Sequence, residues 1–425
     1  MTIAILGFLL FLLIFSAVPI TWALGFTGLI GLIMVGGNPM TLIPQSIYNG
    51  VSFFPLLAIP FYIMAGEMMC RGGITRRLVN LSSLIIGRVP GSLAQVNILC
   101  SMFFGGITGS AVADTSSVGA MLIPAMVEEG YSREESVAVT VTSSIMGPII
   151  PPSIIMVLYG SAMKVSIGSL FAGGAIPGIL VGLALSGVVI IRNRKHHFPV
   201  RKQVYSNEQN KKIIKEAIAP LMLPIIIMGG ILSGIFTATE AGCIALIYTI
   251  IVSMFVLKKI KIYQIPEIIL STMKTTSTIL IIVGCSKTLS WALALLQIQN
   301  SVKELFLSNI HSSFVFLLIV NLLYLFLGTL MDPAAALLLF APLLGPIALG
   351  YGIDPIHFGL ITCINLNIGN ATPPLGQCLF VGCKIGKIQL LKVSVAVLPY
   401  LIALIAVLLL VTYIPAISLF LPSKL

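Results

Sequence analysis

The sequence predicts an all-α polytopic membrane protein. Only 9% of the 425 residues are charged and 58% are hydrophobic, whereas charged residues make up about 25% of a soluble globular domain. Apolar runs of about 20 residues, the length that crosses a bilayer as a helix, recur from one end of the chain to the other. The alternating strand pattern of an outer-membrane barrel is absent from the sequence.

The net charge of +11 does not indicate a nucleic-acid partner. Lys and Arg cluster in short loops, as the positive-inside rule expects, and the hydrophilic stretch 192–216 contains no nucleic-acid-binding module. The seven cysteines are scattered through apolar segments, which is typical of buried hydrophobic residues rather than of a disulfide framework. The four histidines lack metal-ligand spacing, so no transition metal is expected.

The apolar runs predict five crossings and one re-entrant hairpin in each half of the chain. In a hairpin, two arms too short to span alone enter and leave on the same face. The N-terminal run lacks a basic region and is interpreted as a span, not a signal peptide. In the first half we expect spans at 2–18, 20–36, 56–69 and 170–191, a connector at 37–50, a hairpin at about 92–127 and a broken span at about 137–158. In the second half we expect spans at 217–236, 240–257, 277–297 and 393–421, a hairpin at about 312–349 and a broken span at about 358–382.

These segments predict two repeats, 1–191 and 217–425, joined by a cytoplasmic linker at 192–216. An odd number of crossings per repeat turns the second copy upside down relative to the first. This inverted-topology arrangement is found in many secondary transporters, whose binding site lies at the interface between the repeats. The basic loops then all lie on the cytoplasmic face and both termini lie outside.

Each repeat contains the same combination of polar and helix-breaking residues. Asp114 and Asp332 lie 218 positions apart in uncharged runs of small residues, and Pro-Pro pairs at 151–152 and 373–374 lie 222 positions apart. Neither GPIIPPS (147–153) nor GNATPPLG (369–376) is compatible with a continuous helix, because proline removes a backbone hydrogen bond and clashes with the preceding turn. Freed carbonyl groups suit Na⁺, and half-helix N-termini attract anions. A kink that only shapes packing is the alternative.

The two aspartates allow two interpretations. Ionisable groups within apolar segments are costly and usually functional, so Asp114 and Asp332 are candidates to coordinate or attract a cation near the hairpin tips. Each is also a good start for the second hairpin arm, as a helix cap, and both roles can hold together. Neutral donors and acceptors at Asn365, Asn367, Asn370 and Thr372 suit a polyhydroxylated or carboxylate ligand.

Six stretches together resemble the large membrane subunit of TRAP (tripartite ATP-independent periplasmic) transporters. They spread over nearly the whole chain, and their combination is specific. The stretches are LLAIPFYIMAGEMM (56–69), GSAVADTSSVGAMLIPAM (109–126), GPIIPPS, GIFTATEAG (234–242), MDPAAALLLFAPLL (331–344) and GNATPPLG.

The resemblance implies a multi-pass protein of the bacterial inner membrane that imports a small organic acid together with Na⁺ and needs no other cofactor. It implies two protein partners, a small four-helix membrane subunit and a periplasmic binding protein that delivers the substrate. It also implies an elevator mechanism, in which a domain carrying both hairpins slides against a scaffold. Because the chain begins directly with the large subunit's first span, the small subunit is expected to be a separate polypeptide.

The resemblance also carries two sodium sites onto this chain by position. The first uses Thr108 and Ser110 with the carbonyl groups of Gly147, Ile150 and Pro152. The second uses Gly328 with carbonyl groups around Gly369 and Thr372. Further candidates for ion or substrate binding are Asp114, Thr115, Asp332, Asn365, Asn367, Asn370, Pro373 and Pro374.

Two other functions compete with this interpretation. A stand-alone Na⁺-coupled anion symporter or Na⁺/H⁺ antiporter could use the same architecture. An intramembrane enzyme could use Asp114 and Asp332 as an acid/base pair, but the sequence contains no G-x-S-x-G, H-E-x-x-H or comparable catalytic spacing. The sequence therefore favours a transporter and not an enzyme.

Overall fold

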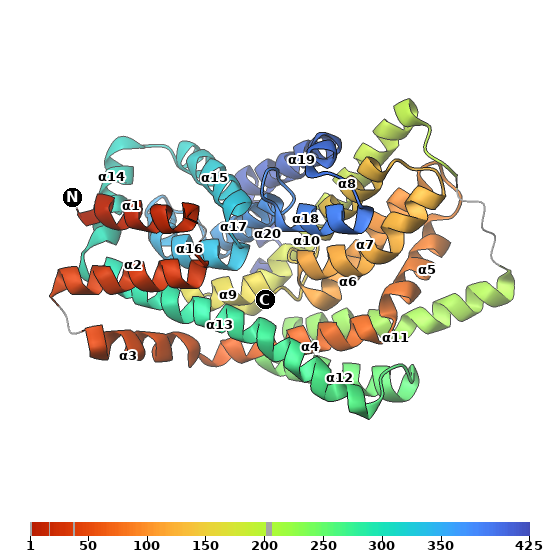
Figure 1. Ribbon diagram of the computed structural model, residues 1–425, viewed down its shortest axis with the longest axis horizontal. Helices are drawn as coiled ribbons and strands as arrows, with labels where there is room; N and C mark the ends of the chain where they lie inside the picture. Colours follow the sequence, from red (N-terminus) through yellow and green to blue (C-terminus); the bar gives the residue numbers. More distant parts are fainter. Residues whose placement is uncertain (1, 17, 37–38, 201–205) are drawn as a thin grey trace.

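The computed structural model describes residues 2–16, 18–36, 39–200 and 206–425. Within these ranges all the named elements are helices, arranged as an elongated bundle (Figure 1). Seven helices are long and apolar enough to cross a membrane, or eight if one bent pair is counted as a single span. The predicted fold class, an all-α polytopic membrane protein, is confirmed.

The first part of the chain forms ten α-helices. They are α1 (Thr2–Phe15), α2 (Ile20–Val35), α3 (Pro39–Val51), α4 (Ala58–Arg71), α5 (Ile74–Ile86), α6 (Ser92–Thr108), α7 (Ala111–Glu128), α8 (Arg133–Ser144), α9 (Ile154–Met163) and α10 (Ile167–His196).

The second part forms ten more. They are α11 (Asn207–Leu232), α12 (Ala238–Ile251), α13 (Ile265–Leu295), α14 (Ile298–Asn309), α15 (Ser313–Leu330), α16 (Pro333–Gly350), α17 (Pro355–Gly369), α18 (Gln377–Gly386), α19 (Leu390–Tyr413) and α20 (Pro415–Leu419).

The predicted connector at 37–50 is wrong for its described part, which is helix α3. Pro39 stands at the first helical position, where a missing N–H costs nothing because that group would be unpaired anyway. A short 3₁₀ turn (Phe54–Leu57) joins α3 to α4 at an angle of 60°. Residues 37 and 38 of the predicted connector lie outside the described residues.

The predicted linker 192–216 is helical at both ends. Helix α10 continues to His196, and α11 begins at Asn207 behind a capping box in which Ser206 and Gln209 each bond the other's backbone N–H. Such a reciprocal cap stabilises a helix start even in a charged segment. Residues 201–205 of the linker lie outside the described residues.

The hairpins and broken helices have well-defined chain breaks. Helices α6 and α7 form the first hairpin and join at Gly109, whose φ of +62° favours glycine. Helices α15 and α16 form the second hairpin, which turns at Met331. The broken helices are α8–α9, interrupted at residues 145–153, and α17–α18, interrupted at residues 370–376.

The two copies share one register, which corrects the predicted pairing of the aspartates. Ser110 and Asp332 both cap the second hairpin arm and are 222 positions apart, and Ser132 and Asp354, which cap the broken helices, have the same spacing. Helices α7 and α16 are both 18 residues long. The counterpart of Asp332 is therefore Ser110 and not Asp114. The repeat boundaries and the inversion of the second copy stay predictions.

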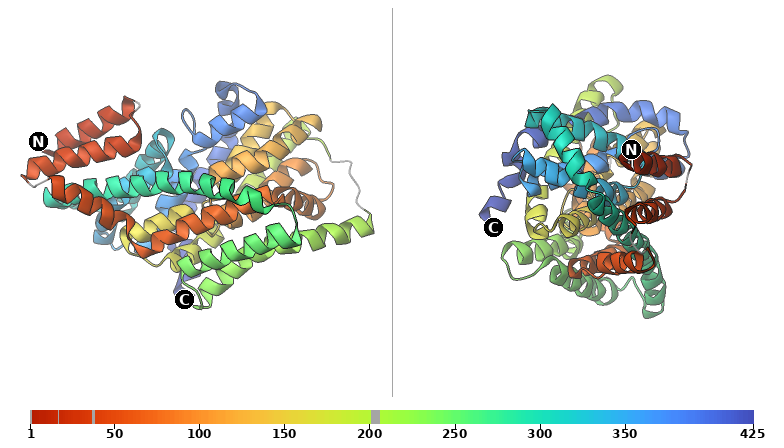
Figure 2. Two further views of the ribbon diagram at one scale, coloured as in Figure 1. Left: turned by 60° about the horizontal axis from the view of Figure 1, so that its bottom comes forward. Right: turned by 90° about the vertical axis from the view of Figure 1, so that its left-hand side faces the viewer.

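Helix α13 packs against helices from both parts of the chain. Its neighbours are α2, α3 and α4 in the first part and α16 of the second hairpin, and it runs obliquely through the view of Figure 1. The contact with α2 is close because Gly28 lies against the backbone of Leu289 and Gly31 against Ala292. Small residues allow this approach between membrane helices. Helices α1 and α2 lie together at one end of the molecule, as Figure 2 also shows.

Candidate functional site

A cavity of about 570 Å³ lies where both hairpins, both broken helices and α13 meet, and we call it the central cavity. Its wall is formed by the tip of the first hairpin (109–113), the tip of the second (332–334), parts of both broken helices and one face of α13. A binding site between the two copies is the expected location in transporters with repeats.

The first hairpin tip touches the break in α8–α9. A Cβ atom on Gly109 would lie 2.5 Å from the carbonyl oxygen of Pro152, and one on Gly147 would lie 3.2 Å from the carbonyl oxygen of Ser110. Because glycine has no Cβ atom, the backbone of the hairpin tip can approach the backbone of the break at these two positions. The structure therefore brings together Ser110, Gly147 and Pro152, three residues of the first predicted sodium site.

The other two residues of that site have local contacts. The Thr108 hydroxyl donates to the carbonyl oxygen of Phe104, one turn earlier in α6. The Ile150 side chain packs against Gly178 of α10, and its N–H donates to the carbonyl oxygen of Met146. Thr108 also packs against Gly66 of α4, so the side chains of both residues contact helices outside the hairpin and its broken helix.

The second hairpin repeats this contact with α17. A Cβ atom on Gly328 would lie 2.7 Å from the carbonyl oxygen of Leu366, and one on Gly369 would lie 2.3 Å from the carbonyl carbon of Gly328. The Thr372 hydroxyl donates to the carbonyl oxygen of Ile368. The peptide bonds Pro151-Pro152 and Pro373-Pro374 are both cis.

Asp332 lies in the wall of the central cavity and also caps α16. One carboxylate oxygen accepts the N–H of Ala334 at 2.9 Å, and the other accepts the Gln377 amide at 3.5 Å. The capping interpretation of the sequence is therefore confirmed for Asp332. The carboxylate also lies beside the cavity, so its role in coordinating or attracting a cation stays a prediction.

Asp114 occupies a different environment. It lies in the first turn of α7, behind the cap residue Ser110, and is fully buried. Among the described residues neither carboxylate oxygen accepts a hydrogen bond of ordinary geometry, and the polar groups closest to it are the hydroxyl groups of Ser101 and Ser144. The adjacent Thr115 is also buried and donates to the carbonyl oxygen of Ala111. The capping interpretation is wrong for Asp114, because Ser110 already holds that position.

The predicted asparagines divide into two groups. Asn367 and Asn370 line the central cavity, and no described residue donates a hydrogen bond to the buried side-chain oxygen of Asn370. Asn365 instead donates to both the carbonyl and the side-chain oxygen of Asn321, which ties α17 to α15. Asn365 therefore supports the site from behind and does not line the cavity.

The contribution of α13 to the cavity wall was not predicted from the sequence. Lys274, Thr275 and Thr278 line the central cavity, and its charged wall residues are Lys274 and Asp332. Among the described residues, Lys274 forms no recorded ion pair. The signal was the polar run STMKTTST (271–278), most of which lies before the predicted span at 277–297. Helix α13 begins at Ile265 and includes it.

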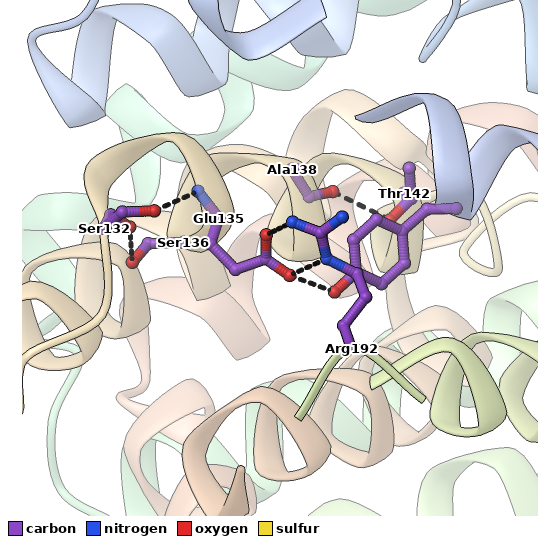
Figure 3. A network of polar contacts seen from close by, with 7 residues as sticks. Ser132, Glu135, Ser136, Ala138, Thr142 and Arg192 are labelled. Carbon is purple, nitrogen blue, oxygen red and sulfur yellow. Dashed lines mark hydrogen bonds and ion pairs between the residues drawn. The ribbon is translucent and has the colours of Figure 1, made fainter. Parts of the chain in front are cut away.

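A second missed feature is a buried ion pair that holds the first half of the broken helix. Glu135 of α8 accepts two hydrogen bonds from the Arg192 guanidinium of α10, at 2.9 and 2.5 Å, and another from the Tyr400 hydroxyl of α19 (Figure 3). Bidentate pairs of this kind fix geometry as well as adding energy. The network ties three helices together away from the central cavity.

Two hairpins and two broken helices around a polar cavity define this chain as a helical membrane transporter. Residues 7–417 match the model of the family described as "Tripartite ATP-independent periplasmic transporter, DctM component". The chain belongs to this family, which confirms the resemblance to the TRAP large membrane subunit. With its spans, this membership makes it a multi-pass protein of the bacterial inner membrane.

Similar proteins agree with this assignment. The chain is 42% identical to the uncharacterized protein YgiK of Salmonella typhimurium, over 96% of this chain and 94% of that protein. It is 37% identical to the sialic acid TRAP transporter large permease protein SiaM of Vibrio cholerae, over 97% of this chain and 96% of SiaM. The family is thus one of transporter components rather than enzymes.

A solved structure shares the fold. The YdaH transporter of Alcanivorax borkumensis superposes with a TM-score of 0.66, covering 90% of this chain and 89% of YdaH at 15% sequence identity. At this identity the similarity concerns the fold alone.

Proposed function

We propose that this chain is the permease subunit of a TRAP transporter that imports a small organic acid by coupling it to Na⁺. The observation that carries the proposal is the central cavity, which both hairpin tips and both broken helices enclose and which is lined by the Lys274 ammonium group, without an ion pair in the described part of the chain. A periplasmic binding protein would deliver the substrate, and a separate small four-helix membrane subunit would complete the complex. The family's name, a tripartite transporter with a periplasmic component, supports both partners.

The wall of the cavity fits a hydroxylated carboxylate. The Lys274 ammonium attracts a carboxylate, and Thr275 and Thr278 add hydroxyl groups on the same face of α13. Across the cavity, the Asn370 side-chain oxygen lacks a partner and can accept a hydrogen bond from a substrate hydroxyl. Substrates of this class include sialic acid, the cargo named for the relative SiaM, and other sugar acids or C4-dicarboxylates.

Sodium would bind where each hairpin tip meets its broken helix. Backbone carbonyl oxygens and hydroxyl groups are suitable ligands for a hard cation, and half-helix ends supply them in other secondary transporters. The first site would use Thr108, Ser110, Gly147, Ile150 and Pro152. Gly328, Gly369 and Thr372 would form the second. The buried, unpaired carboxylate of Asp114 favours a cation in this region, because an isolated charge in an apolar interior needs a counter-charge or a proton.

An elevator movement fits the packing of the bundle. The central cavity lies between the hairpin tips on one side and α13 on the other, and α13 is packed against α2, α3 and α4. Sliding the hairpins with their broken helices along α13 would carry the cavity across the membrane. The alternative is a stand-alone symporter or antiporter with this architecture.

Reconstitution into liposomes with and without partners tests the proposal. The chain is combined with the small subunit and binding protein encoded beside it, and uptake of radiolabelled sialic acid, succinate and sugar acids is measured with a Na⁺ or a K⁺ gradient. We expect uptake only with Na⁺ and all three proteins. Uptake by the chain alone would favour the stand-alone symporter, and Na⁺-independent uptake would contradict the coupling.

Substitution of Lys274 tests the substrate site in the same assay. Lys274→Gln is expected to lower uptake at least tenfold, and Lys274→Arg to retain part of it because the positive charge remains. Lys303→Gln on α14, whose lysine does not line the cavity, is the matched control and should take up substrate at the wild-type rate. Equal uptake by Lys274→Gln and the control would remove Lys274 from the site.

A further inference from the structure

A second cavity of about 250 Å³ contains two lysines and no acidic residue. Lys164, which ends α9, and Lys287 of α13 both line it, together with Ser161, Ser286 and Ser290. The remaining wall comes from α3, the 3₁₀ turn at Phe54–Leu57, α9 and α16. Two ammonium groups that share one small cavity repel each other unless an anion lies between them.

The polar groups of the second cavity have free hydrogen-bonding capacity. Neither Lys164 nor Lys287 forms a recorded ion pair among the described residues. The hydroxyl oxygen of Ser161 is buried and has no hydrogen-bond partner within the residues that the structure describes. A buried polar atom without a partner is uncommon in native proteins and suggests a bound water, ion or ligand.

Helix α13 links the second cavity to the central one. The residues of α13 that line the central cavity (274, 275, 278, 279 and 282) continue into those that line the second cavity (283, 286, 287 and 290). Residues 274, 278, 282, 286 and 290 follow one another in steps of four, so the lining residues form a continuous stripe that winds slowly around α13. Lys274 and Lys287 stand 13 residues apart, which corresponds to about 20 Å along the axis and about 140° around it.

The orientation of α13 in the membrane follows from the basic loop that precedes it. The end of α13 near Lys274 begins just after the basic run Lys258, Lys259 and Lys261, and the positive-inside rule predicts that this run is cytoplasmic. The end near Lys287 then faces the periplasm. This is the side on which a binding protein would release its substrate.

We propose that the second cavity is a carboxylate-binding site, formed by Lys164 and Lys287, that holds the anionic substrate before it reaches the central cavity. The serine hydroxyl groups would hydrogen-bond the carboxylate or its neighbouring hydroxyl groups. The identity of the anion as the transported substrate rests on the proposed function, whereas the existence of an anion site does not.

The phosphate of an anionic lipid shares the chemistry of a carboxylate and is the competing occupant. The position of the second cavity, next to the central cavity along α13 and between α9 and the second hairpin helix α16, favours the soluble anion. The experiment therefore tests both sources on the isolated full-length chain, without partners or a Na⁺ gradient.

A cysteine placed at Ser290 reports the charge of the cavity. In a background whose native cysteines are replaced, Ser290→Cys is treated with an anionic and a cationic methanethiosulfonate reagent of similar size. We expect the ratio of anionic to cationic rate constants to fall about tenfold when Lys164→Gln and Lys287→Gln are added, because two positive charges are removed. Lys303→Gln, which leaves the cavity wall intact, is expected not to change the ratio. An unchanged ratio in the double variant would overturn the proposal.

Protection by ligands identifies the occupant. Sialic acid, succinate or a sugar acid at millimolar concentration is expected to slow modification of Ser290→Cys by a neutral reagent in nanodiscs of phosphatidylcholine, and to have no effect in the double lysine variant. Protection that requires phosphatidylglycerol and no organic acid would assign the cavity to a lipid and overturn the proposal, as would no protection by any of these anions. A failure of Na⁺-driven uptake would leave these results unchanged, so the two proposals fail separately.

Discussion

Asp332 lines the central cavity and also caps α16, and one pair of substitutions separates these two contributions. Asn caps a helix about as well as Asp, whereas Ala loses the cap at a cost of about 0.5–2 kcal/mol. We therefore expect Asp332→Asn to keep the wild-type thermal stability and Asp332→Ala to lose it partly. If the carboxylate also takes part in transport, both variants lose Na⁺-driven uptake.

The matched control for Asp332 is Asp354, which caps α17 in the same way, accepting the N–H groups of Ile356 and His357, and does not line the central cavity. Asp354→Asn is expected to leave both stability and uptake unchanged. Normal uptake by Asp332→Asn would show that its carboxylate acts only as a cap.

The difference between Asp114 and Asp332 could not be read from the sequence. Both are aspartates in small-residue runs, so the pattern predicted an equivalent pair. The true counterpart of Asp332 is Ser110, because Ser and Asp perform the same capping task with different side chains. Matching aspartate to aspartate suggested an offset of 218 positions between the copies, whereas the cap positions in the structure give 222.

Contact between a hairpin and its broken helix depends on paired glycines. A Cβ atom on Gly369 would lie 2.3 Å from the carbonyl carbon of Gly328, so Gly369→Ala must separate α15 from α17. Overpacking of this kind typically costs about 1–3 kcal/mol. We expect lower thermal stability and the loss of uptake, measured on the purified protein and in liposomes.

Gly187→Ala in α10 is the control for this substitution, because a Cβ atom added at Gly187 would have no other atom within 4 Å. A change of Gly to Ala inside an open helix removes a weak helix former. Gly187→Ala is therefore expected to be neutral or slightly stabilising. Equal behaviour of the two variants would contradict the importance of the hairpin contact.

The ion pair between Glu135 and Arg192 holds α8 against α10. The side chain of Glu135 is 4% exposed and that of Arg192 is 20% exposed. Removing one partner of a buried pair leaves an unpaired charge and costs about 3–5 kcal/mol. We expect Arg192→Gln to lower the free energy of unfolding by this amount and thereby the thermal stability of the purified protein.

Replacing both partners tests the origin of that loss. The double variant Glu135→Gln with Arg192→Gln leaves no buried charge and is expected to recover much of the stability. A double variant as unstable as Arg192→Gln would indicate that packing around the two side chains, and not the unpaired carboxylate, causes the effect.

At the scale of the whole molecule, hydrophobicity predicted the long spans and the hairpins, because about 20 apolar residues allow few alternatives in a membrane. Helices α3, α5 and α14 were not predicted, since their polar residues resemble those of loops. The wall that α13 contributes to the central cavity was missed for a related reason. Its run at 271–278 is polar because it faces a cavity, and polarity was taken as the end of the membrane segment.

The orientation of the two copies can be tested at equivalent positions. Glu128 and Gly350 are the last residues of α7 and α16 and are both exposed. If the copies are inverted, Glu128→Cys lies inside and Gly350→Cys lies outside, in a background without other cysteines. A membrane-impermeant maleimide should then label Gly350→Cys in right-side-out vesicles and Glu128→Cys only in inside-out vesicles. Lys211→Cys, in the predicted cytoplasmic linker, should behave like Glu128→Cys. Labelling of the cysteines at 128 and 350 from the same face would contradict the inversion, and with it the expectation that the two hairpins approach the central cavity from opposite sides of the membrane.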